Sequence, residues 1–155
     1  MFSIKKTYVD YNGNEKTETF WFNLNKAELA KLALGPKGGL DGIIEEIQRT
    51  TDAGRVLDLI KEILLMSYGR KTSDGRFAKT DEDGHSYARE FEQTAVFGDI
   101  YMDLFADVDS LVAFINGVVP AQLRDDVALE SRKALDQYRA MEKRAAKDGA
   151  NLEQV

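Results

Sequence analysis

The hydrophobic pattern of this chain changes its period once, and this change limits the folds that are open to it. Between residues 2 and 22, apolar and polar side chains alternate on both sides of the segment Tyr11-Asn12-Gly13-Asn14. Alternation of this kind is typical of half-buried strands, and Asn-Gly is the favoured centre of a two-residue hairpin turn. We therefore predict a β-hairpin, in which such a turn pairs Ile4 with Trp21 and Tyr8 with Thr17.

After residue 22 the apolar residues recur at the spacings of three and four that are typical of amphipathic helices. Asn25 and Glu28 fit the two halves of a capping box at the start of the first helix, and Gly35-Pro36 ends that helix. Two more amphipathic helices are predicted around residues 40–47 and 56–64.

The second half of the chain begins with a polar segment, residues 70–86, which is predicted to be a long loop. Helical spacing then resumes from Tyr87 to Phe105, and Asp107 is placed to cap a further helix that closes at Asn116-Gly117. Beyond this point the residues are mostly strong helix formers, which predicts a long final helix.

We therefore expect a mainly α fold: a small helical domain with an N-terminal β-hairpin, residues 1–120, and a C-terminal helical extension, residues 121–155. In the extension seven basic residues balance seven acidic residues, and the apolar residues are sparse. Such a helix is either solvated on all sides or half of an interface.

Composition excludes several classes of partner. The net charge of −6 disfavours binding to nucleic acid or to anionic membrane surfaces. The apolar runs are far shorter than the roughly 20 residues of a membrane helix, and the N-terminus lacks the pattern of a secretory signal. The chain has no cysteine, which fits a reducing compartment. We expect a soluble protein that is located in the cytoplasm.

One segment imitates a calcium-binding EF-hand loop. Counted from Lys79, the residues Asp81, Asp83, Gly84 and Glu90 fall at the third, fifth, sixth and twelfth loop positions. The first position requires an acidic ligand, whereas the ammonium group of Lys79 would repel the ion. We therefore predict no metal site.

The remaining polar candidates also have simpler interpretations than catalysis. His85 is the only histidine and has no partner motif, so we interpret it as a solvated loop residue. Asp107 and Asp109 fit the cap and first turn of a helix. The glycines around Pro36 lack the spacing of a phosphate-binding loop. We predict no catalytic residue, no cofactor and no enzymatic activity.

Two groups of apolar residues are candidates for protein binding. Five bulky residues fall within nine positions of one predicted helix, which is more than one buried stripe requires. The final helix carries a second, sparser group. The candidates are Phe97, Ile100, Tyr101, Leu104 and Phe105 in the first group, and Leu135, Tyr138 and Met141 in the second.

The order of the predicted elements resembles that of a known family. The segments that carry the resemblance are Tyr11-Asn12-Gly13-Asn14, Thr19-Phe20-Trp21-Phe22-Asn23-Leu24, Ala27-Glu28-Leu29, Tyr68-Gly69, Ser73-Asp74-Gly75-Arg76-Phe77 and Ala113-Phe114-Ile115-Asn116-Gly117-Val118-Val119-Pro120. Over about residues 8–120 the chain is similar to the tail assembly chaperones of long-tailed bacteriophages.

The resemblance implies a function. Proteins of this family bind the tape measure protein, a very long helical polypeptide, and coat it until tail tube subunits polymerise around it. It therefore implies the tape measure protein as partner, with the tail tube protein as a possible second partner, a homo-oligomer, and the host cytoplasm as location. Many family members also have a frameshifted, longer form.

Two other functions stay open. The chain could be a structural head–tail or tail component of the virion, or a small regulatory protein that binds a host target. A hydrolase is disfavoured because the sequence offers no nucleophile and base set.

Overall fold

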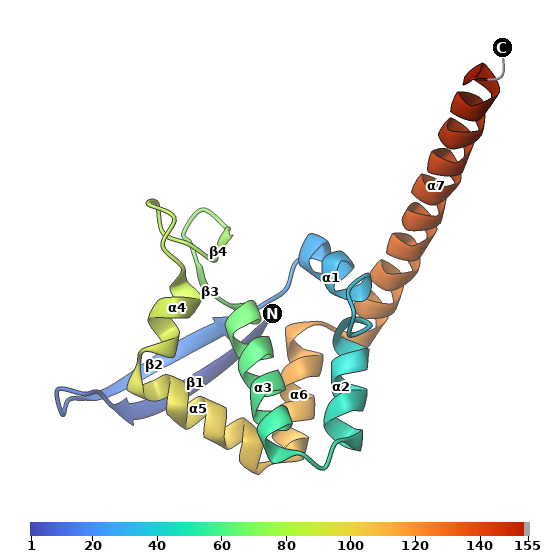
Figure 1. The fold of residues 1–155 in the computed structure, drawn as a ribbon. Helices are drawn as coiled ribbons and strands as arrows, with labels where there is room; N and C mark the ends of the chain where they lie inside the picture. Colours follow the sequence, from blue (N-terminus) through green and yellow to red (C-terminus); the bar gives the residue numbers. More distant parts are fainter. Residues whose placement is uncertain (154–155) are drawn as a thin grey trace.

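The computed structural model describes residues 1–153, which form a four-stranded antiparallel sheet covered on one face by helices (Figure 1). The strands, in their order across the sheet, are β1 (Phe2–Val9), β2 (Glu15–Phe22), β3 (Tyr68–Lys71) and β4 (Phe77–Ala78). The helices are α1 (Lys26–Ala33), α2 (Gly39–Arg49), α3 (Ala53–Ser67), α4 (Tyr87–Glu92), α5 (Ala95–Ala106), α6 (Val108–Val118) and α7 (Ala121–Glu153).

The predicted fold class is correct in part. Helices make up 63% of the protein, the N-terminal hairpin is present, and the long C-terminal helix is present. The sheet, however, extends beyond the hairpin, so the fold is mixed α and β rather than mainly α. The prediction of a long loop at residues 70–86 was wrong in part. β3 begins at Tyr68, pairs with β2 and extends into this segment, and β4 lies within the segment and pairs with β3.

The hairpin register also differs from the prediction, by one residue. Ile4 lies opposite Phe20, and Tyr8 lies opposite Lys16. The cause is Asp10, whose carboxylate accepts hydrogen bonds from the backbone amides two and four residues later, both at 2.9 Å. Gly13 takes a φ of 83°, and a backbone hydrogen bond from the amide of Asp10 to the carbonyl of Asn14 closes a loop of three residues instead of two.

This register decides which side chains face the helices. The even-numbered residues of both strands point to one face, where Phe20 and Phe22 are buried. Phe22 contacts the ring of Phe114 from α6, with ring centroids 5.1 Å apart. Phe91 from α4 stacks on Tyr68 from β3 at 4.2 Å. The aromatic core therefore lies between the sheet and the helices α4 to α6.

Side-chain caps fix where α1 and α6 begin, as predicted. Asn25 and Glu28 form both hydrogen bonds of the capping box at the start of α1. Asp107 caps α6 by accepting hydrogen bonds from the amide of Asp109 and the hydroxyl of Ser110. Asp107 and Asp109 are thus part of a helix start, in agreement with the interpretation of these two carboxylates as capping residues.

Candidate protein-binding surfaces

The structure divides the candidates on α5 between the core and its edge. Phe97, Ile100 and Leu104 are buried in the hydrophobic core. Tyr101 and Phe105 are half-buried and pack against that core. The hydroxyl of Tyr101 donates a hydrogen bond to the backbone carbonyl of Leu57 at 2.7 Å, and burial raises the pKa of this phenol. Of the five candidates on α5, Tyr101 and Phe105 thus keep the larger exposed surface.

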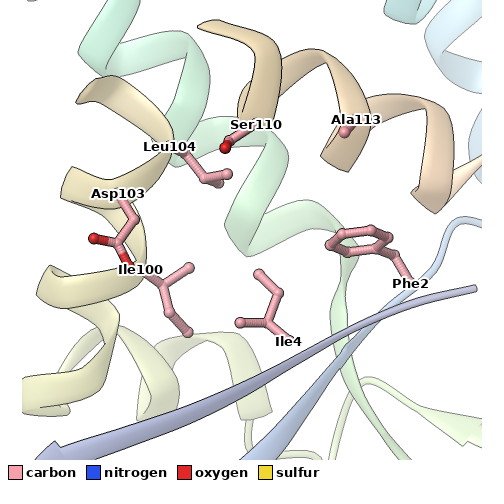
Figure 2. Close-up of a pocket in the computed structure, with 7 residues that line it drawn as sticks. All are labelled: Phe2, Ile4, Ile100, Asp103, Leu104, Ser110 and Ala113. Atoms are coloured by element: carbon pink, nitrogen blue, oxygen red, sulfur yellow. The ribbon is translucent and has the colours of Figure 1, made fainter. Parts of the chain in front are cut away.

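An apolar groove lies between the edge strand β1 and the helices α5 and α6 (Figure 2). It has a volume of about 250 Å³. Phe2 and Ile4 from β1 face Ile100 and Leu104 from α5 across it, and Ala113 from α6 closes one end. Two of the α5 candidates therefore reach this groove from the core, which gives a partner room for one or two apolar side chains.

The two polar residues of the groove are already engaged. Asp103 forms an ion pair with Lys6, and the hydroxyl of Ser110 donates to the carboxylate of Asp107. The ion pair of Asp103 joins α5 to β1, and Ser110 belongs to the cap of α6. The other residues that line the groove are apolar.

The second candidate surface is the end of α7. This helix of 33 residues leaves the body beside α1 and extends away from it (Figure 1). We call residues 132–153 the arm. Tyr138 is 66% exposed and Met141 is 60% exposed, whereas Leu135, nearer the body, is half-buried. These three candidates line one shallow hollow of the helix surface.

The exposed apolar face of the arm continues the face that packs on the body. Val127 is buried at the root of α7, and Tyr138 follows it by eleven residues, which is about three helical turns. Leu152, which is 77% exposed, continues the same side. Leu135, Tyr138, Met141 and Leu152 form a stripe on this face; the described residues cover Leu135 in part and leave the other three more than half exposed.

Arg124 fixes the direction of the helix at its root. Its side chain is buried and donates to the carboxylate of Asp41 in α2 at 3.0 and 3.2 Å. It also donates to the side chain of Asn116 at 3.1 Å and to the backbone carbonyl of Val119 at 2.8 Å. A guanidinium held by four hydrogen bonds gives the arm a defined orientation relative to α2 and α6.

The EF-hand-like segment is folded as a turn. The ammonium group of Lys79 donates to the backbone carbonyls of Asn23 and Met66, and burial lowers its pKa. The carboxylate of Asp81 accepts hydrogen bonds from the amides of Asp83 and His85, and the bond from His85 is the main cause of its lowered pKa. Ligand atoms of Asp81, Asp83 and His85 lie within 4.8 Å of one another, and these turn contacts account for that proximity. His85 is exposed, as predicted.

An apolar groove and an exposed apolar helix face are features of proteins that work by binding other proteins. Among the described residues, no helix has both the length and the apolar composition to cross a membrane. The family comparison is specific: the profile of a family described as phage tail assembly chaperone matches residues 1–154. The chain belongs to this family.

The match confirms the resemblance found in the sequence. It also extends to the C-terminal helix, whereas the resemblance covered only about residues 8–120. Membership of a chaperone family indicates a non-enzymatic role in tail assembly. No curated protein and no solved structure matches the chain.

Proposed function

We propose that this chaperone binds the tape measure protein in the host cytoplasm and covers its apolar helical segments until the tail tube polymerises around it. The observation that carries the proposal is the exposed stripe of the arm, where Tyr138 and Met141 are more than half exposed on a helix that extends from the body. An apolar helix face without a cover suits a helical client, because two such faces bury each other.

The size of the stripe suits reversible binding. Complete burial of one large apolar side chain stabilises a complex by roughly 1.5–3 kcal/mol, while association itself costs about 4–15 kcal/mol. Three or four such side chains therefore give weak binding at a single site. A long client could still be covered, because several linked or self-associated chaperones bind more tightly together than one alone. Tail tube subunits could then displace them in turn.

The proposal is tested by co-expressing the full chain with fragments of the tape measure protein. The double variant Tyr138→Ala/Met141→Ala should lose co-purification and keep its melting temperature, because both side chains are exposed. Leu129→Ala is the matched control: Leu129 is 55% exposed on α7 but lies nine residues before Tyr138, on the opposite side of the helix.

Equal recovery of the fragments by the wild type and the double variant would contradict the role of the arm. A further measurement separates the main alternative function. A structural tail component would remain in purified virions, whereas an assembly chaperone would be absent from them.

A further inference from the structure

A row of basic residues borders the apolar stripe of the arm on one side. Arg132, Arg139 and Lys143 are exposed and are separated by seven and four residues, so they share one side of the helix. Arg139 and Glu142 line the same hollow as Tyr138 and Met141. None of the ion pairs formed within residues 1–153 includes a member of this row.

The row belongs to a larger asymmetry of charge. The arm has six basic and four acidic residues, a net charge of +2. Since the whole chain has a net charge of −6, the remainder carries −8. The arm is thus net basic, although the rest of the chain is strongly acidic.

We propose that the arm binds an amphipathic helix whose apolar stripe is bordered by aspartate or glutamate residues. This inference rests on the proposed function and specifies which segments of the tape measure protein the arm selects. When two helices pair through apolar stripes, the residues that border the stripes meet across the interface and determine the choice of partner. An acidic border would meet the basic row, whereas a basic border would be repelled by it.

The same row argues against a second arm as the partner. In an antiparallel pair of identical helices, each border faces its own copy. Arg132, Arg139 and Lys143 would then lie against the same three residues, and like charges oppose such pairing. The acidic body of a second copy is a different occupant, which the test distinguishes by the size of the assembly.

The test uses two synthetic helical peptides that share one leucine stripe, bordered by glutamate in the first and by lysine in the second. Their affinities for the full chain are measured by fluorescence anisotropy at low and high salt. We expect the glutamate peptide to bind about tenfold more tightly at low salt and the difference to shrink at high salt. Tyr138→Ala/Met141→Ala should abolish the binding of both peptides.

Charge reversal provides the decisive comparison. The row variant is Arg132→Glu/Arg139→Glu/Lys143→Glu, and the matched control is Lys133→Glu/Arg144→Glu/Lys147→Glu, which changes the charge equally on a side of the helix that the row does not occupy. The row variant should prefer the lysine peptide, and the control should keep the preference for glutamate. Equal effects of the two variants would overturn the inference, because only the overall charge would then matter.

Two further outcomes keep the inference distinct from the proposed function. If tape measure fragments co-purify equally with the wild type and the row variant, the inference fails and the proposed function stands. If no fragment binds the wild type, the proposed function fails whatever the peptides show. Light scattering tests the remaining occupant, the acidic body of a second copy. If the wild type forms oligomers that the row variant does not form, while the preference for the glutamate peptide is unchanged, the row binds a second copy. This result would overturn the inference.

Discussion

At the scale of single residues, the groove beside β1 depends on one close approach. A Cβ atom at Gly117 would lie 2.2 Å from the ring of Phe2. The ring also packs edge-on against Phe114, with centroids 5.5 Å apart. Phe2 is therefore held between α6 and the open space of the groove, and the size of residue 117 determines where its ring can lie.

We predict opposite effects of alanine at two helical glycines. Gly117→Ala should destabilise the protein by about 1–3 kcal/mol, because the ring of Phe2 must leave its site. Gly98→Ala in α5 should stabilise it by up to about 1 kcal/mol, because no atom beyond the adjoining helix backbone and the two chain neighbours lies within 4 Å of the new methyl group and alanine favours helix. Urea denaturation measures both changes. Destabilisation by both variants would show that the space around Gly98 is not open.

At the scale of elements, Asp10 determines the geometry of the hairpin and gives it a pH dependence. Hydrogen bonds from the backbone amides of Asn14 and Asn12, together with Lys16, hold the pKa of this carboxyl below its usual value of 3.8. Since the folded state binds the proton less readily than the unfolded state, Asp10 stabilises the fold above about pH 4. This contribution is lost as the pH falls through the lowered pKa.

We therefore expect Asp10→Asn to lower the melting temperature at pH 7. Below about pH 4, the melting temperature of this variant should fall less with decreasing pH than that of the wild type. The asparagine side chain still accepts the amide hydrogen bonds but carries no charge. Glu15→Gln is the control, because the neighbouring carboxylate of Glu15 accepts no hydrogen bond from the loop amides that donate to Asp10. A melting temperature of Asp10→Asn with the same acid dependence as the wild type would contradict the assignment.

The elements also show how far local sequence determines this fold. Helix starts were predictable because a cap and its partner lie three residues apart, as at Asn25 and Glu28. The hairpin register was missed because Asn-Gly alone allows loops of two or three residues, and the side chain of Asp10 decides between them. The strand β3 was missed because its pairing with β2 joins residues more than forty positions apart, such as Trp21 and Gly69.

At the scale of the whole molecule, the candidate surfaces were predictable only in outline. The group on α5 and the group on the final helix were both visible as apolar residues at helical spacing. Ile100 and Leu104 are buried because the sheet and α6 pack against them, and the local sequence pattern does not show these contacts. The projection of the arm likewise depends on where the body ends: Val127 is the last buried residue of the described chain.

That boundary leads to a prediction about truncation. A chain that ends after Ser131 keeps Val127 and all four hydrogen bonds of Arg124, so its melting temperature should stay within a few degrees of that of the full chain. It loses the stripe and should therefore not bind tape measure fragments. Calorimetry and co-purification measure these two properties.

A shorter chain provides the control. Truncation after Pro120 removes the side chain of Arg124 and leaves Asn116 and the carbonyl of Val119 without their donor, while the loss of Val127 exposes the apolar surface that it covered. Asn116 is exposed and can bond to water, whereas the buried carbonyl of Val119 costs about 1–3 kcal/mol when it is left unsatisfied. Together with the uncovered apolar surface, this loss should markedly destabilise the chain. If truncation after Ser131 proved equally destabilising, the arm would be part of the folding unit. The exposed stripe would then be apolar surface that the fold tolerates because it needs the helix, and not a surface kept free for a partner.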